Sequence, residues 1–260
     1  MIRFFTTLFI PLLCLAMVGC LGGDGEINID TPPPISEAKR VTVVPFFADA
    51  GATEDVIKLS GRISVNLATR LELIFKDAEW IYDISNKVKP VDDKLTELGL
   101  TPEQVYADPA LAAKLGQALE ADMVIIGMVD NPKLDGRDYN QHLMKQGRQG
   151  GISGTSTYIC TRLIAIGRTR VKVIDTSSGE MLFNNHVQSY LKYWYAYQTQ
   201  QSEQHIFKSD MDRLADLGKH LPLRIAYELY PTGLKSEAEE KILLKPDIVL
   251  KGTGGFFEFN

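Results

Sequence analysis

The sequence predicts an α/β fold, a single domain in which a mixed β-sheet packs against helices. A β-branched run, Arg40–Phe46, is interrupted by proline and is typical of a buried strand. The near-continuous apolar run Ala121–Val129 predicts a second buried strand that is covered on both faces. Apolar residues recur at helical spacing between these runs, and a hairpin pattern follows them. This order of strands and helices is typical of an α/β sandwich.

The first helix is predicted to begin after Thr53. This residue is a suitable N-cap, and the acidic Glu54 and Asp55 favour the positive end of the helix dipole. Trp80–Tyr82 is the candidate for the next strand. One face of the predicted helix is apolar, with Val56, Leu59, Ile63, Leu67, Leu71 and Ile74 at helical spacing.

Two further helix starts precede the strand Ala121–Val129. Thr101–Gln104 combines an N-cap, a proline at the first helical position and a residue able to close a capping box. Asp108 and Pro109 repeat this start signal. The apolar residues of the helix that follows are Leu111, Leu115, Ala118 and Leu119.

The C-terminal half is predicted to form a long hairpin and a closing helix. The strand Leu163–Asp175 turns at Asp175–Glu180 and returns through Met181–Tyr197. Pro222 is expected to kink or split the closing helix, and residues 231–260 are expected to form an irregular tail, which places the domain at residues 39–230. The apolar residues of the first strand are Ile164, Ile166, Val171 and Val173, and those of the helix are Phe207, Met211, Leu214, Leu221, Ile225 and Leu229.

The N-terminus has the pattern of a cleavable signal. Arg3 precedes the apolar stretch Phe4–Val18, which is shorter than the ~20 residues that a membrane-spanning helix needs. Leu15–Cys20 resembles the lipobox of bacterial lipoproteins, with Gly19 before the cysteine and Met17 in place of the usual leucine. The resemblance implies that residues 1–19 are removed and that Cys20 is acylated. The alternatives are an ordinary signal peptide and a short N-terminal anchor.

Residues 20–38 are predicted to be a lipidated tether. The glycines of Leu21–Gly25 favour flexibility, and Pro32–Pro34 favours a stiff spacer. Acyl chains on Cys20 would hold the protein to a membrane more firmly than a single chain does. Since Leu21 is not aspartate, the sorting preference of such lipoproteins predicts the outer membrane, with the domain facing the periplasm.

Composition and cysteine count limit the classes of function. The formal net charge of −5 argues against a nucleic-acid partner, which requires a basic face. Of the three cysteines, Cys14 would leave with the signal and Cys20 would carry lipid, so Cys160 has no partner for an intramolecular disulfide. The apolar neighbours of Cys160 predict a buried thiol.

No motif for catalysis, a cofactor or a metal is found. Gly147–Ser156 lacks the Gly-Lys dipeptide of a phosphate-binding loop and is one residue short of a nucleophile elbow, so a surface loop is predicted. An enzyme acting through Ser153 or Cys160 is the alternative. The histidines, His142, His186, His205 and His220, lack the spacing of helical metal ligands.

Three local strings resemble the CsgG-like family, which shares its fold with the N-terminal domain of TolB. They are Arg40–Phe46, the helix-to-strand segment Leu115–Gly127 and the turn segment Val171–Glu180. The resemblance implies envelope assembly, binding or secretion without a catalytic site. Channel members of the family insert amphipathic hairpins into the membrane, whereas residues 131–157 here are polar, rich in glycine and without such alternation. A pore is therefore not expected.

The segment Phe183–Tyr197 is unusually aromatic and alternates along the strand. In one interpretation its odd-numbered side chains are buried and its even-numbered ones face water. In the other, an exposed tip binds a partner through Tyr190, Tyr193, Trp194 and Tyr195, because Tyr and Trp are common interface anchors.

The sequence thus predicts a lipid-anchored, non-catalytic binding or assembly module of the bacterial cell envelope. The expected partners are the membrane, through the N-terminal lipid, and an envelope protein or a component of cell-wall synthesis or secretion. Homo-oligomerisation is left open. The alternative is an oligomeric CsgG-like secretion channel component of the outer membrane.

Overall fold

The central strand of the sheet, β4 (Met123–Val129), joins a parallel half to an antiparallel half. The computed structural model describes residues 34–84, 88–146, 152–198, 208–230 and 250–251, all within one unit, Pro33–Asn260. On one side of β4 lie the parallel strands β1 (Arg40–Val43) and β3 (Glu79–Tyr82), in the order β3-β1-β4. The short β2 (Phe47–Ala48) pairs with the end of β4.

The antiparallel half is dominated by one long strand, β6 (Ile152–Asp175). Along one edge, the N-terminal part of β6 pairs with β5 (Lys133–Gln146) and its C-terminal part, Thr169–Asp175, pairs with β4. Along its other edge it pairs with β7 (Met181–Gln198), which in turn pairs with β8 (Leu250–Lys251). The part of β6 that precedes Thr169 therefore continues beyond the end of β4.

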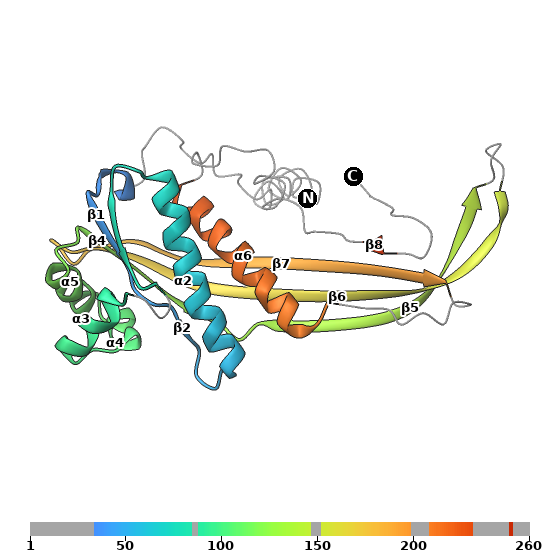
Figure 1. Cartoon of the computed structure of the whole chain (residues 1–260), viewed down its shortest axis with the longest axis horizontal. Helices are drawn as coiled ribbons and strands as arrows, with labels where there is room; N and C mark the ends of the chain where they lie inside the picture. Colours follow the sequence, from blue (N-terminus) through green and yellow to red (C-terminus); the bar gives the residue numbers. More distant parts are fainter. Residues whose placement is uncertain (1–33, 85–87, 147–151, 199–207, 231–249, 252–260) are drawn as a thin grey trace, which may run out of the picture. The chain divides into compact units, whose positions relative to one another are not determined.

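Helices cover both faces of the sheet, with α2 over the parallel strands and α6 over β6 and β7. A 3-10 turn, η1 (Pro34–Glu37), precedes β1. Figure 1 shows α2 (Glu54–Ile74) and α6 (Asp210–Leu229) side by side over one face. The opposite face is covered by α3 (Pro90–Leu98), α4 (Pro102–Ala107) and α5 (Pro109–Ala118). The α/β fold with a mixed sheet is confirmed.

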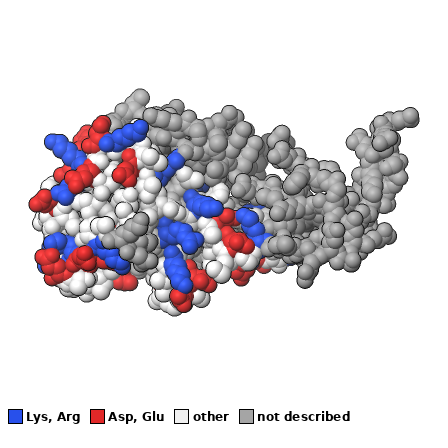
Figure 2. Space-filling view, viewed as in Figure 1, with Lys and Arg blue, Asp and Glu red and all other residues white. Residues whose placement is uncertain are grey.

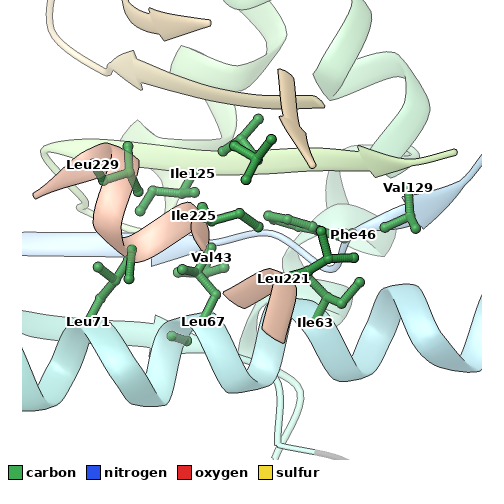
Figure 3. Close-up of a cluster of buried hydrophobic side chains, with 14 of the residues drawn as sticks. Val43, Phe46, Ile63, Leu67, Leu71, Ile125, Val129, Leu221, Ile225 and Leu229 are labelled. Atoms are coloured by element: carbon green, nitrogen blue, oxygen red, sulfur yellow. The ribbon is translucent and has the colours of Figure 1, made fainter. Parts of the chain in front are cut away.

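The two layers of helices enclose two apolar clusters. Odd-numbered β4 residues such as Ile125 and Val129 pack with Leu67 of α2 and Leu221 of α6, as Figure 3 shows. Even-numbered β4 residues such as Ile126 pack against α3–α5. Full burial of each aliphatic side chain stabilises the fold by about 1.5–3 kcal/mol. The two-sided burial of β4 explains its near-continuous apolar sequence.

Most predicted helix starts are confirmed. Thr101 and Gln104 form the capping box, and the Asp108 side chain accepts a hydrogen bond from the Ala110 N–H. Thr53 occupies the N-cap of α2 but makes no capping hydrogen bond through its side chain. The helix α3 was not predicted, although its start at Pro90 and its left-handed C-cap at Gly99 (φ 65°) are recognisable signals.

The expected split of the closing helix at Pro222 is wrong, because α6 is one helix from Asp210 to Leu229. Proline removes the N–H that would bond the carbonyl oxygen four residues earlier, which is that of Gly218. The side-chain amide of Asn66 on α2 donates to this oxygen at 2.8 Å. A neighbouring helix thus supplies the donor that the proline lacks.

The predicted surface loop Gly147–Ser156 is wrong for Ile152–Ser156, which belong to β6, while residues 147–151 lie outside the described residues. Lys133–Gln146 and the first half of β6 pair from Lys133 opposite Ile166 to Gln146 opposite Ile152. Backbone hydrogen bonds, which any non-proline residue can form, hold this hairpin together. Apolar alternation reports burial of one face, so its absence does not exclude a strand.

Candidate binding surface

The strand β7 separates a buried row of side chains from a row in contact with solvent. Ser189, Leu191 and Tyr193 are buried against the α2–α6 side of the sheet. His186 and Gln188 are exposed on the other side. The interpretation that odd-numbered residues enter the core is therefore confirmed for this part of the strand.

Tyr193 is only 1% exposed, so its prediction as an exposed anchor is wrong. Its hydroxyl donates to Asp216 Oδ2 of α6 at 2.8 Å. The ammonium of Lys208 forms an ion pair with the same carboxylate and lies 4.8 Å from the centroid of the Tyr193 ring. Parity along the strand directs Tyr193 toward α6, where its polar end has a partner.

The other residues of the predicted tip have different positions. Tyr190 is 39% exposed and lies on the side of β7 that faces away from α2 and α6. The backbones of Trp194 and Tyr195 pair with Arg162 and Thr161 of β6, while their side chains lie outside the described residues. A partner site that uses Tyr190, Trp194 and Tyr195 remains a prediction.

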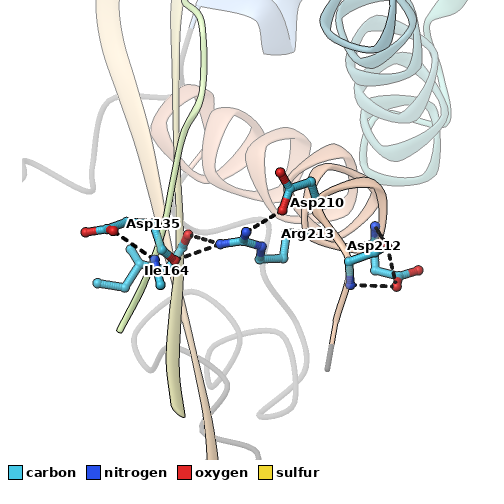
Figure 4. Close-up of polar contacts among 7 residues, drawn as sticks. Asp135, Ile164, Asp210, Asp212 and Arg213 are labelled. Atoms are coloured by element: carbon cyan, nitrogen blue, oxygen red, sulfur yellow. Dashed lines mark hydrogen bonds and ion pairs between the residues drawn. The ribbon is translucent and has the colours of Figure 1, made fainter. Parts of the chain in front are cut away.

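A buried arginine joins α6 to the hairpin, as Figure 4 shows. Arg213 is 6% exposed, and its Nη1 donates to the carbonyl oxygens of Asp135 on β5 and Ile164 on β6, each at 2.8 Å. Its Nη2 donates to Asp210 Oδ1 at 2.5 Å. Hydrogen bonds to a charged group are stronger than neutral ones. Arg213 therefore fixes α6 on β5 and β6 just beyond the end of β4, where β5 replaces β4 as the partner of β6.

The other side of β5–β7, which we term the open face, lies beyond the cover of α3–α5. Directly opposed residues of antiparallel strands point to the same side of a sheet, so the pairing defines its members. None of their side chains is buried. They are Lys133, Asp135 and Arg137 of β5, Arg162, Ile164, Ile166, Arg168 and Arg170 of β6, and His186, Gln188, Tyr190 and Lys192 of β7.

The cover by α4 ends at Lys172. Its ammonium donates to the carbonyl oxygen of Tyr106 at 2.8 Å and lies 4.0 Å from the centroid of the Tyr106 ring. Burial under α4 lowers the pKa of Lys172 from its usual value. The open face begins one position further along the same side of β6, at Arg170, which pairs with Asp130 at 3.4 Å.

Within the described residues, the other candidate side chains named from the sequence do not assemble into a metal or catalytic site. No group of three or more His, Cys, Asp or Glu side chains there could hold a metal ion. Ser153 and Cys160 belong to β6, but their side chains, like those of His142 and His205, lie outside the description. None of the helices within the described ranges is both long and apolar enough to cross a membrane.

A small pocket lies between the N-terminal halves of α2 and α6. Its volume is about 60 Å³, well below the several hundred Å³ of typical small-molecule sites. Its lining has three charged residues, all from α2, and four apolar ones. They are Asp55, Lys58, Leu59, Arg62, Met211, Leu214 and Ala215.

Comparison with known proteins gives fold-level neighbours of low similarity. No family model and no curated protein matches the chain. It is similar to a hypothetical protein from Chlamydia trachomatis (14% identity, TM-score 0.31, covering 58% of this chain and 72% of that one). It is also similar to the lipoprotein GNA1162 from Neisseria meningitidis, with 12% identity and a TM-score of 0.33 over 58% of this chain and 79% of that one. A third match is the PelC dodecamer from Paraburkholderia phytofirmans, with 13% identity and a TM-score of 0.35 over 79% of this chain and 95% of that one.

Because these TM-scores are low, the matches decide neither family nor function, and the resemblance to the CsgG-like family remains a prediction. The residues that the sequence interpretation missed are Arg213, Asp216 and the cations of the open face. Arg168, Arg170 and Lys172 alternate with Thr169 and Val171 in the sequence. This period of two was the available signal for a polar face of β6.

Proposed function

We propose that this chain is a lipid-anchored, non-catalytic binding or assembly module of the bacterial cell envelope. The observation that carries the proposal is the short apolar stretch Phe4–Val18 together with the lipobox-like segment Leu15–Cys20, which overlaps its end. Cys20 is the acylated residue, and the domain acts at the periplasmic side of the outer membrane. The fold contributes three antiparallel strands, β5–β7, that the hydrogen bonds of Arg213 and Tyr193 fasten to α6.

Acylation is tested by growing cells with an alkyne-bearing palmitate and coupling a dye to the purified chain. The wild-type chain is expected to take the label, and Cys20→Ala to lose it and remain as the longer precursor. Cys14→Ala is the matched control, since Cys14 lies in the same apolar stretch and is expected to leave labelling unchanged. Equal labelling of wild type and Cys20→Ala would contradict the assignment.

The partner is expected to be another envelope protein, of cell-wall synthesis or secretion, contacting the aromatic part of β7. Crosslinking in native membranes is expected to capture it with wild type and much less with Trp194→Ala plus Tyr195→Ala. The matched control is Ile57→Ala, which removes a 57% exposed apolar side chain from α2. Equal capture by both variants would remove the aromatic assignment.

The second candidate is an oligomeric secretion channel, favoured by the continuation of β5 and β6 beyond β4. The polar sequence of residues 131–157 argues against it. Ring-shaped particles that conduct ions in planar bilayers would establish the channel. A crosslinked ladder of the chain with itself, without conductance, would support an assembled module.

A further inference from the structure

The open face concentrates positive charge on a chain whose formal net charge is −5. Among the described residues, this face carries six cationic side chains and one carboxylate, Asp135, while Asp130 beyond the end of β4 pairs with Arg170. On the side that carries α2 and α6, by contrast, basic and acidic residues are interspersed (Figure 2). The cations are Lys133, Arg137, Arg162, Arg168, Arg170 and Lys192.

Two of these cations oppose each other directly across the sheet. Arg137 of β5 and Arg162 of β6 are register partners, and like charges in this arrangement destabilise a sheet. Within the described residues, neither arginine has a carboxylate partner, and Arg162 Nε has no hydrogen-bond acceptor. Arg168 donates to a neutral group, the side-chain oxygen of Gln188, at 2.9 Å. An external anion would relieve this repulsion.

The cations surround an apolar patch. Ile164 and Ile166 lie half-buried on the open face, with Tyr190 directly opposite Ile166. Neither aliphatic residue belongs to the two buried clusters. A combination of Arg and Lys with Tyr and aliphatic side chains is typical of surfaces that contact the headgroup region of a membrane. A purely ionic polymer would not require the apolar part.

We propose that the open face binds a membrane surface that contains anionic phospholipid. The arginines contact lipid phosphates, and Tyr190 enters the headgroup region. The 13 residues between Cys20 and the start of η1 at Pro34 could span at most about 47 Å, so a domain anchored at Cys20 stays close enough to the same membrane for this face to contact it. That last step rests on the proposed anchor, whereas lipid binding by the open face does not.

The test uses the full chain with an azide-bearing phenylalanine in place of Tyr190, coupled to a polarity-sensitive dye. Vesicles of phosphatidylglycerol and phosphatidylcholine are expected to shift the dye emission to the blue, and vesicles of phosphatidylcholine alone are not. High salt should abolish the shift, because it screens exposed charges. The same dye at position 57, on α2, should stay unshifted in both cases.

The charge variant is Arg162→Glu plus Arg168→Glu. Removing two cations is expected to raise the half-maximal vesicle concentration at least 25-fold, about fivefold for each cation near an anionic surface. The matched control, Arg62→Glu plus Lys219→Glu, makes the same change in net charge on α2 and α6 and should leave binding unchanged. If the double variant fails to fold, the exposed Arg168→Glu alone gives the comparison.

Three results would overturn the proposal. One is an equal shift with both kinds of vesicle, and another is an equal loss in both charge variants. The third is a shift caused by soluble heparin with none caused by vesicles, which would assign the face to a soluble polyanion. Since the dye reports contact of the open face, its outcome is distinct from palmitate labelling at Cys20.

Discussion

The contact between Asn66 and the carbonyl of Gly218 should determine how well α6 tolerates Pro222. Asn66 Nδ2 donates to this partly buried oxygen at 2.8 Å, and no N–H at position 222 can do so. Asn66→Ala removes the donor and leaves the carbonyl without a partner. An unsatisfied buried carbonyl costs about 1–3 kcal/mol. Because the site is only partly buried, we expect a loss of about 1–2 kcal/mol in the free energy of unfolding.

A double-mutant cycle isolates this interaction. In a Pro222→Ala background the new backbone N–H can bond Gly218, so Asn66→Ala should then cost less. The coupling energy between the two sites is expected to be about 1 kcal/mol. Any general effect of Pro222→Ala on the helix cancels in the cycle.

The assay is urea unfolding followed by circular dichroism, with the full chain of each variant. Thr96→Ala is the control, because the Thr96 hydroxyl donates within its own helix, α3, to the Asp92 carbonyl at an exposed position. It should change the free energy of unfolding by no more than about 0.5 kcal/mol. The reasoning is refuted if Asn66→Ala costs the same in both backgrounds.

Two further predictions concern a turn and a close approach. Hydrogen bonds from Ser177 and then Ser178 lower the pKa of Asp175 to about 2. Its contribution to stability should therefore be present above the unfolded pKa near 4 and fade as the pH falls toward 2. In Asp175→Ala the urea midpoint should no longer show this fall between about pH 4 and pH 2. The assignment would be contradicted if the midpoint of the variant fell with pH as that of the wild type does. Gly127→Ala would place a Cβ 2.5 Å from the ring of Phe46, so overpacking should cost about 1–3 kcal/mol in urea unfolding. Gly61→Ala, where the Cβ meets nothing within 4 Å, should cause no comparable loss.

The elements that the sequence predicted are those whose information is local. Helical periodicity located α2, and continuous apolar character located β4, because each pattern reports burial along one segment. The first half of β6 was missed since its partner strand, not its own sequence, satisfies its backbone. The donor that bonds the Gly218 carbonyl of α6 comes from Asn66, a residue far away in the sequence.

The candidate surface divides in the same way. Alternation along β7 was sufficient to predict that odd-numbered residues would be buried, and Tyr193 follows that rule. Its partner Asp216 comes from another element, so only the folded structure identifies it. The apolar residues assigned together to β6 also separate, because Ile164 and Ile166 have the parity of the open face while Val171 and Val173 enter the core.

The two faces of β6 are governed by different constraints. Core packing against α2 and α6 determines Ala165, Val171 and Val173, where a change of volume would cost stability. No such packing determines Arg162 and Arg168, and the register of Arg162 with Arg137 opposes folding. Arg213 holds the strands that present these charges in one arrangement, so a flat anionic surface could meet several of them without a large loss of conformational entropy. The cations of the open face do not stabilise the fold, and Arg213 orders the strands that carry them. We therefore expect this face to serve binding.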